Sequence, residues 1–361
     1  MDHLIEHLEI RNFKSIRELK LSGFKRINLF IGRPNVGKSN LLEALSLFAI
    51  PYLWNNRVRR LKDLVRLQNP VELFYQGNLS EISFISLKRW QYEEKEECRI
   101  LYEPDKGELK CTIFISRPNN PLHGAVDSFA RDGHYPSEQY RVEFTFENNL
   151  KGGQSYFAKE YRDFVQDIKP YSFKNSIPYR QIQIPFLNPP FGDNILHVLQ
   201  LMPELRQLYA SWFRSYGLRL VLDATNQSLR IQRDIGADEV FQLPYSSVAD
   251  TLQRIIFYKT AVASNKNSVL LFEEPEAHAY PPYISEFTQE VIKSKTNQTF
   301  IVTHSPLVVE QFLTEAIDDL GIFMVDFKDG QTVVKGLTTD EIREVYKYGM
   351  DLFFNGEAYL D

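Results

Sequence analysis

The chain has 361 residues, enough for one large or two ordinary domains, and 43% of them are hydrophobic, which is enough for a substantial core. Its 42 Lys and Arg against 47 Asp and Glu give a net charge of -5, so the totals argue against a protein that binds nucleic acid through overall basic charge. Cys98 and Cys111 lack the spacing of a zinc site.

The beginning of the chain has neither the basic start nor the apolar core of a signal peptide. The longest apolar stretch, residues 41–54, contains Glu43 and is too short to span a bilayer. We therefore expect a cytoplasmic protein with reduced cysteines and no membrane association.

The first 31 residues predict three strands, over residues 4–13, 15–21 and 26–31. The third strand runs into Gly32-Arg33-Pro34-Asn35-Val36-Gly37-Lys38-Ser39, a complete GxxxxGK[ST] phosphate loop, and an amphipathic helix follows it. In such a loop the backbone amides of residues 35–39 surround a phosphate, Lys38 reaches the β and γ phosphates, and the Ser39 hydroxyl ligates Mg²⁺. We therefore expect a nucleotide with Mg²⁺ here.

Between the loop helix and residue 240 the pattern changes several times. A basic stretch with helical spacing carries Arg57, Arg59, Arg60, Lys62 and Arg66. Residues 71–147 alternate as antiparallel β structure, with a long loop over 118–138. Residues 150–217 are rich in aromatics and predict a mainly helical insert with helices at 195–201 and 203–216, and a hairpin follows over 218–233.

From residue 243 the chain alternates helices and strands, which predicts a parallel sheet shared with the strand before the phosphate loop. The nucleotide-binding core would then comprise residues 1–50 and 240–315. The buried strand 268–272 ends in Glu273-Glu274-Pro275-Glu276, at the edge where such sheets place ligands. We expect Glu273 to hold Mg²⁺ and Glu274 to accept a proton from the attacking water. A solvated acidic turn is the alternative.

Two further motifs could contact a phosphate. The next strand, 299–303, ends in Thr303-His304-Ser305-Pro306, where His304 could sense a γ-phosphate or, alternatively, simply lead into a helix capped by Ser305. Upstream, Ser247 and Asp250 predict a helix start, and this helix end could offer its amides to a phosphate held by another subunit.

In chain order these motifs are RNFKSI at residues 11–16, GxxNxGKSN, the helix start near 250, LLFEEPEAH at 270–278, and THSP. The order resembles ABC-type ATPases of the SMC/RecF/OLD group, particularly their short stand-alone AAA-labelled members, over about residues 1–50 and 240–310. The resemblance implies one α/β P-loop NTPase head over residues 1–361 with an antiparallel β subdomain. It also implies ATP sandwiched between two heads of a homodimer or larger homo-oligomer.

The resemblance also implies roles for individual residues. Those at the phosphates and metal would be Gly32, Asn35, Val36, Gly37, Lys38, Ser39 and Asn40, with Lys14 and Ser15 near the nucleotide. Glu273 replaces the usual metal-binding Asp, Glu274 is the base and His304 the switch. The signature touching the other subunit's ATP would be Ser247, Ala249, Asp250 and Thr251. Because Thr251 stands where glycine is expected and Ala249 where serine often is, we expect slow or partner-dependent hydrolysis.

Three other functions are weighed against this one. A GTPase needs an NKxD element, and Asn265-Lys266-Asn267-Ser268 lacks its Asp, while Asp318-Asp319-Leu320-Gly321 comes too late for a DxxG element. An OLD-type nuclease needs a further metal-binding domain, and about fifty residues after Pro306 are too few for it. A RecF-like DNA-binding ATPase remains an alternative, because the basic stretch 57–66 could contact DNA phosphates.

Because no nuclease domain is expected in this chain, we expect any effector to be a separate polypeptide, and a nuclease is one candidate for it. The ATPase would then be one component of an anti-phage defence or toxin–antitoxin-type system.

Overall fold

The computed structural model of the chain describes residues 4–54, 60–89, 95–116, 140–157, 167–223, 225–236 and 238–359. Its centre is a six-stranded sheet in the order β16-β15-β3-β14-β13-β9. The strands are β3 (Ile27–Ile31), β9 (Ile168–Tyr171), β13 (Val269–Glu273), β14 (Gln298–Val302), β15 (Leu320–Lys328) and β16 (Gln331–Gly336). The first five are parallel to their neighbours, and β16 turns back antiparallel along β15.

A second sheet is antiparallel and has seven strands in the order β2-β1-β4-β5-β6-β7-β8. These are β1 (Ile5–Phe13), β2 (Ile16–Ser22), β4 (Ser83–Arg89), β5 (Lys95–Glu103), β6 (Glu108–Ser116), β7 (Tyr140–Glu147) and β8 (Gly152–Phe157). Their alternating burial, clearest in β1 and β5, is that of strands with a single core-facing side.

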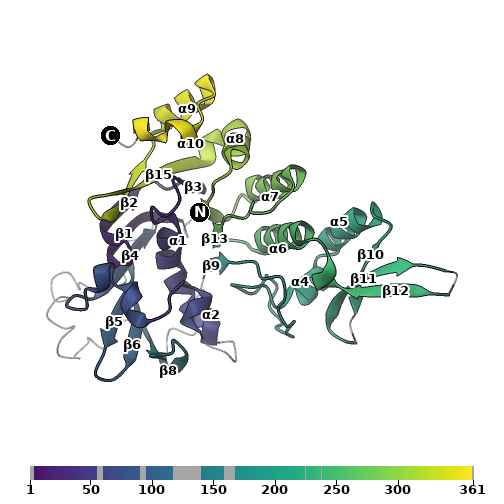
Figure 1. Cartoon of the computed structure of the whole chain (residues 1–361), viewed down its shortest axis with the longest axis horizontal. Helices are drawn as coiled ribbons and strands as arrows, with labels where there is room; N and C mark the ends of the chain where they lie inside the picture. The colour runs from purple at the N-terminus through teal and green to yellow at the C-terminus, as the bar shows by residue number, and fades with distance from the viewer. Residues whose placement is uncertain are drawn as a thin grey trace.

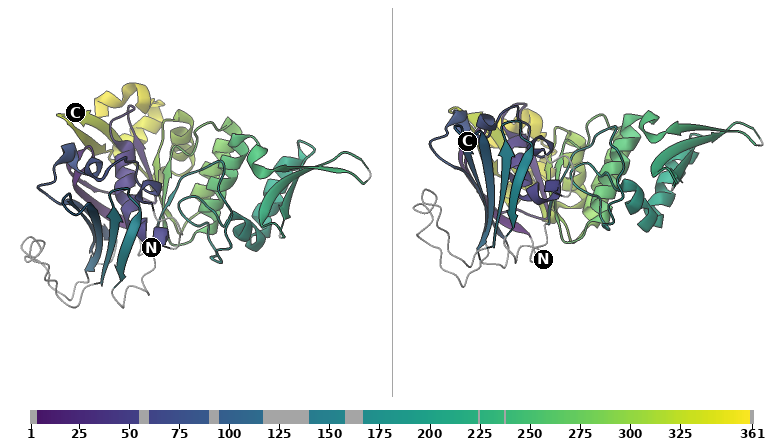
Figure 2. Two further views of the ribbon diagram at one scale, coloured as in Figure 1. Left: turned by 60° about the horizontal axis from the view of Figure 1, so that its bottom comes forward. Right: turned by 90° about the horizontal axis from the view of Figure 1, so that it is seen from below.

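The helices are α1 (Lys38–Ser46), α2 (Ile50–Trp54), α4 (Ile195–Leu201), α5 (Pro203–Arg214), α6 (Asp250–Ser264), α7 (Pro281–Lys293), α8 (Pro306–Glu315), α9 (Thr339–Tyr348) and α10 (Leu352–Asn355). Figure 1 shows α1 beside the antiparallel sheet, and an arm formed by α4, α5 and a small sheet projecting on the opposite side. That sheet contains β10 (Arg219–Asp223), β11 (Ser228–Asp234) and β12 (Val240–Pro244). Figure 2 shows the same elongated outline from two other directions.

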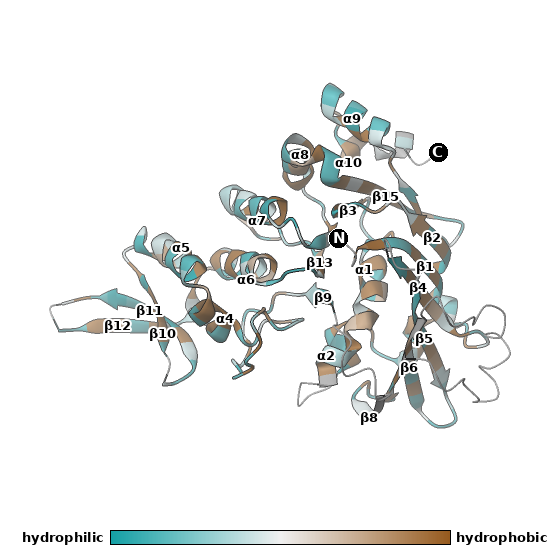
Figure 3. Ribbon diagram, turned by 180° about the vertical axis from the view of Figure 1, so that it is seen from behind, coloured by the Kyte–Doolittle hydropathy of each residue, from teal (hydrophilic) through white to brown (hydrophobic). Residues whose placement is uncertain are grey.

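Two hydrophobic clusters explain this layering. Strand β3 is buried at all five positions, as expected for a central parallel strand covered on both faces. Its Phe30 belongs to the cluster between the two sheets, around α1, whereas Leu29 and Ile31 belong to the cluster under α6, α7 and α8. Apolar colouring accordingly follows β15 and α1 in Figure 3. The parallel sheet is therefore held from both sides, which fixes the ends of its strands.

Most predicted elements are present, and the parallel sheet shared by the phosphate-loop strand and the later strands is confirmed. The predicted placement of the first two strands in the nucleotide-binding core differs from the structure, because β1 pairs with β2 and β4 in the antiparallel sheet. The region 150–217 contains its two expected helices, but it also supplies β8 to the antiparallel sheet and β9 to the parallel one. A helical insert thus describes only residues 195–214.

Further differences concern short or late elements. The helix predicted from Ser247 begins at Asp250, because residues Tyr245–Ser247 form a separate 3-10 turn. The hairpin over 218–233 gains a third strand, β12. The predicted loop 118–138, together with Arg57 and Arg59, lies outside the described residues. In the described part of 60–66, residues Leu61–Asp63 form one 3-10 turn rather than the helix that the spacing suggested.

Candidate functional site

The phosphate loop connects β3 to α1, as its sequence predicted, and two glycines fit where no side chain could. A Cβ at Gly32 would lie 2.0 Å from the carbonyl oxygen of Val325, and one at Gly37 would lie 2.0 Å from the Thr332 hydroxyl. Gly37 also has φ 98° and Asn35 has φ 62°, the left-handed region that winds the backbone around the loop. The loop is thus pressed against the hairpin of β15 and β16.

Lys38 and Ser39 open α1 and face the acidic end of β13. Lys38 as a whole residue is 5% exposed, and its ammonium donates to the carbonyls of Gly32 at 2.9 Å and Arg33 at 2.6 Å. Burial lowers the pKa of Lys38 to about 8, while the charges of Glu274 and Glu273 oppose that shift. The Ser39 hydroxyl donates to Oε1 of Glu273.

Glu274 follows the last residue of β13 and is held in a costly backbone conformation. Its φ of 43° lies in the left-handed region, which non-glycine residues rarely adopt. Its amide donates to the Val302 carbonyl of β14 at 2.9 Å, and its Oε1 lies 3.6 Å from Nε2 of His304. Burial and the charge of Lys38 lower the pKa of His304, while Glu274 opposes this. Glu274 and His304 therefore form a neighbouring pair.

Because β3, β14 and β13 are adjacent in the sheet, their carboxyl ends bring together Lys38, His304 and Glu274. Ser305 caps α8 by accepting from the amide of Val308 at 3.4 Å, as predicted. In the THSP motif, Ser305 is therefore the residue that caps the helix. The His304 ring lies beside Glu274.

Glu276, which the sequence motifs leave without a role, joins the end of β13 to the THSP motif. Its Oε1 accepts from the Thr303 hydroxyl at 2.6 Å and from the His304 amide at 2.9 Å. Its Oε2 is buried and has no hydrogen-bond partner among the described residues, and burial raises the pKa of Glu276. Glu276 is therefore a positioning residue that holds the backbone of His304 against the loop after β13. Only the repeated acidic pattern EEPE could have drawn attention to it.

Replacing Glu276 with alanine is expected to lower the free energy of unfolding by about 2–3 kcal/mol, because two hydrogen bonds to a carboxylate are lost. Glu276→Gln keeps an acceptor oxygen and removes the buried charge, so we expect a loss below about 1 kcal/mol. Urea denaturation of both variants measures this. Equal losses for Ala and Gln would contradict the assigned hydrogen bonds.

A chain of polar contacts supports the loop from behind. The Asn40 amide donates to the Ser15 hydroxyl at 2.6 Å, and that hydroxyl lies 2.6 Å from Oγ1 of Thr332. Thr332 in turn donates to the Val36 carbonyl at 2.8 Å, and the Val36 side chain is buried in the core. Asn40, Ser15 and Val36 thus shape the loop through contacts with β16, a strand that the sequence did not reveal.

The other polar residues expected near the nucleotide are paired. Lys14 forms an ion pair with the buried Glu43 and donates to the Arg66 carbonyl at 2.6 Å. Arg66 contacts Glu43 at 2.9 Å and Glu273 at 2.8 Å. Arg66 belongs to the basic stretch considered for DNA binding, and its guanidinium lies at the end of β13, against Glu273. Glu43 and Arg66 are site neighbours that the sequence pattern could not identify.

The signature residues lie at the start of α6, on the part of the molecule that carries the arm (Figure 1). Thr251 donates its hydroxyl to the His278 carbonyl at 2.7 Å, and Asp250 pairs with Arg254 at 2.5 Å. Ala249 precedes the helix without a side-chain cap, and Ser247 lies in the 3-10 turn. Of these residues, Thr251 contacts the loop after Glu276.

The residues weighed for guanine recognition have structural partners. Asn265 accepts from the buried Lys169 at 2.7 Å and donates to Tyr171 at 2.8 Å. Asp319 pairs with Arg26 at 2.9 Å. These contacts give both residues a role in packing the parallel sheet.

The oxygen atoms of Ser39 and Glu273 are the groups of this site that could hold Mg²⁺. Among the described residues no cluster of three or more His, Cys, Asp or Glu side chains could hold a metal by itself. Mg²⁺ commonly uses one or two protein oxygens together with water and substrate phosphates. Ser39 and Glu273 offer such a pair, and Arg66 shows that Glu273 accepts a positive charge there. The donor set fits this ion when a phosphate accompanies it.

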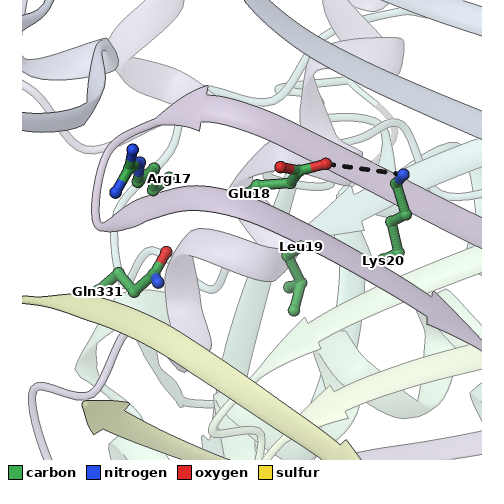
Figure 4. Close-up of a pocket in the computed structure, with 5 residues that line it drawn as sticks. All are labelled: Arg17, Glu18, Leu19, Lys20 and Gln331. Carbon is green, nitrogen blue, oxygen red and sulfur yellow. Dashed lines mark ion pairs between the residues drawn. The ribbon is translucent and has the colours of Figure 1, made fainter. Parts of the chain in front are cut away.

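A separate hollow lies on the surface between β2 and β16 (Figure 4). Its lining consists of Arg17, Glu18, Leu19, Lys20 and Gln331. Glu18 already pairs with Lys20 at 3.6 Å and with Arg11 at 3.6 Å. The hollow contains none of the residues of the phosphate-loop site, and its single carboxylate, Glu18, is already paired.

No helix in the described ranges combines the length and apolar character needed to cross a membrane.

Comparisons with solved structures return heads of SMC proteins. An SMC head bound to the C-terminal winged-helix domain of ScpA is 14% identical, covering 93% of this chain and 99% of that one with a TM-score of 0.47. An SMC head from Pyrococcus furiosus is 12% identical, covering 95% and 98% with a TM-score of 0.48. The SMC head from Thermotoga maritima is 12% identical, covering 92% and 99% with a TM-score of 0.40.

Two curated relatives match short segments. The uncharacterized protein MJECL10 of Methanocaldococcus jannaschii is 51% identical over 45 residues, which is 12% of this chain and 20% of that protein. An ATP/GTP phosphatase of Helicobacter pylori is 48% identical over 42 residues, 12% of this chain and 11% of that protein. The chain thus covers about a fifth and a tenth of the lengths of these relatives.

A family model matches most of the chain. Residues 27–310, from the strand before the phosphate loop to the helix after His304, match the family described as "AAA domain, putative AbiEii toxin, Type IV TA system". This match confirms the group of AAA-labelled ATPases that the motifs predicted. With its phosphate loop, acidic strand end and THSP turn in one parallel sheet, the chain belongs to the AAA domain family of the putative AbiEii toxin type.

Proposed function

We propose that this protein binds ATP with Mg²⁺ and hydrolyses it, and that nucleotide binding pairs two copies of the chain to control a partner protein. The observation that carries the proposal is the meeting of Lys38, Glu274 and His304 at the ends of three adjacent parallel strands. This arrangement offers a phosphate ligand, a base and a hydrogen-bonding group on one edge of the sheet.

Each residue would act in a defined way. Lys38 would exchange the loop carbonyls for phosphate oxygens, which would give its ammonium a negatively charged partner. Glu274 would accept a proton from the attacking water, and His304 would hydrogen-bond the γ-phosphate. Ser39 and Glu273 would hold Mg²⁺, which when bound neutralises charge on the β and γ phosphates. The backbone strain at Glu274 fits a side chain held for chemistry rather than for packing.

A direct test compares nucleotides and measures phosphate release. We expect the purified protein with Mg²⁺ to bind ATP at least about tenfold more tightly than GTP, because no guanine-reading Asp is present. Isothermal titration measures both affinities, and a phosphate assay measures turnover. Equal or tighter binding of GTP would contradict the ATP assignment, and absence of phosphate release with ATP would contradict hydrolysis.

The family description supports the biological part of the proposal, a component of a toxin–antitoxin or defence system. The start of α6 supports pairing of two copies, since its N-cap residue Ala249 gives no side-chain hydrogen bond to the first amides of the helix, and Thr251 contacts the His278 carbonyl. A phosphate held by a second copy would complete that surface. Slow hydrolysis is expected because Thr251 replaces the signature glycine.

A further inference from the structure

Arg66 reaches into the proposed metal site from a segment far away in the chain. It follows the 3-10 turn Leu61–Asp63, and its side chain extends to the end of β13. Its Nη2 donates to Oε1 of Glu273 at 2.8 Å, and its Nε donates to Oε1 of Glu43 at 2.9 Å. The two carboxylates therefore share one guanidinium.

Arg66 contacts the carboxylate oxygen of Glu273 that also lies next to Ser39, the other proposed metal ligand. Oε1 of Glu273 accepts from the Ser39 hydroxyl as well as from Arg66. Ser39 and Glu273 are the two residues that we propose to hold Mg²⁺. A divalent ion approaching this oxygen meets a carboxylate whose charge is already compensated, so the guanidinium and the ion compete for it.

The burial of the partners shows which contact can open. The side chain of Glu43 is only 7% exposed, and it keeps a second cation, Lys14, if Arg66 leaves. The side chains of Arg66 and Glu273 are 65% and 35% exposed. The Arg66 end of the contact thus borders solvent, and its movement leaves no buried carboxylate without a cation.

We propose that Arg66 and the divalent metal ion exchange at Glu273: the guanidinium pairs with this carboxylate in the metal-free protein, and metal binding displaces it toward solvent. The proposal rests on the proposed function, because it takes Ser39 and Glu273 as the metal ligands. Arg66 is then a residue that sets the metal affinity of the site, and nucleotide without metal leaves the pair intact.

The test measures metal affinity directly. The complex with AMPPNP, a non-hydrolysable ATP analogue, is titrated with Mn²⁺ and followed by electron paramagnetic resonance. Removing a hydrogen bond between charged groups changes an equilibrium about tenfold, so Arg66→Gln is expected to bind Mn²⁺ about tenfold more tightly. Arg66→Lys keeps the positive charge and is expected to stay within about threefold of the natural protein.

Arg60→Gln is the matched control. Arg60 lies on the same segment, is half exposed and pairs with Asp63 at 3.4 Å, so its variant should keep the Mn²⁺ affinity of the natural protein. Unchanged or weaker Mn²⁺ binding by Arg66→Gln would overturn the exchange; weaker binding would instead mean that Arg66 assists the metal–nucleotide complex.

A second measurement needs no variant of altered stability. In the natural protein the Nε proton of Arg66, assigned with Arg66→Lys, should exchange slowly with solvent without metal and faster once Mg²⁺ and AMPPNP are added. An unchanged rate would also overturn the exchange. If the natural protein binds no AMPPNP in titration calorimetry, the proposed function itself fails, which is distinguishable from normal AMPPNP binding without the Arg66 effect.

Discussion

Lys38→Ala is expected to weaken ATP binding by roughly two to four orders of magnitude. Lys38 is buried, and within the described part of the chain its ammonium hydrogen-bonds to loop carbonyls alone, so a phosphate would supply the negatively charged partner of this ammonium. Losing one side of a buried charged contact costs about 3–5 kcal/mol, which corresponds to a factor of roughly 10²–10⁴. Titration calorimetry with ATP and Mg²⁺ measures the effect.

The fold should survive this substitution. Burial of the Lys38 charge is unfavourable, as its lowered pKa shows, so alanine should change the free energy of unfolding little. Lys62→Ala, an exposed lysine on the following segment, is the matched control and should bind ATP normally. ATP affinity within threefold of the natural value for Lys38→Ala would be incompatible with a phosphate-binding role.

Glu274→Gln is expected to bind ATP normally and to hydrolyse it about 10²–10⁴ times more slowly, the usual contribution of a general base. Glutamine has nearly the same shape and can still contact His304, but it cannot accept the proton of water. Because ATP then persists, paired copies should accumulate. Phosphate release measures the first effect, and light scattering after size-exclusion chromatography with ATP measures the second.

Glu310→Gln, an exposed glutamate on α8, serves as the control and should leave both turnover and mass unchanged. Full turnover by Glu274→Gln would remove Glu274 as the base. A monomer under all nucleotide conditions would leave hydrolysis standing but contradict the proposed pairing.

The elements that sequence patterns predicted well are those with short-range causes. The phosphate loop depends on glycines and a helix start within eight consecutive residues, and β3, β13 and β14 are short apolar runs of the kind found in buried parallel strands. Placing Glu273, Glu274 and His304 at strand ends needed only the general rule for the carboxyl edge of such sheets.

Which strands are neighbours was decided by packing over long distances. Strand β9 pairs with β13 although about a hundred residues separate them in the chain. Strand β1 pairs with β4 in the antiparallel sheet and not with a strand of the parallel sheet. Strand periodicity states which face of a strand is buried, but not which strand covers it. The arrangement β3-β14-β13, which unites the proposed site, was therefore a result of tertiary structure.

The sequence was sufficient to predict the nucleotide motifs and the ATPase family, because both reside in contiguous residues whose backbone geometry and chemistry are local. Only the folded chain showed that Thr332 supports the loop through Ser15, that Glu276 holds His304, and that Arg66 belongs to Glu273. The physical reason is that a polar contact between residues 28, 207 or 317 positions apart, as in these three cases, leaves no periodic or compositional trace in the sequence and appears only when the chain has folded.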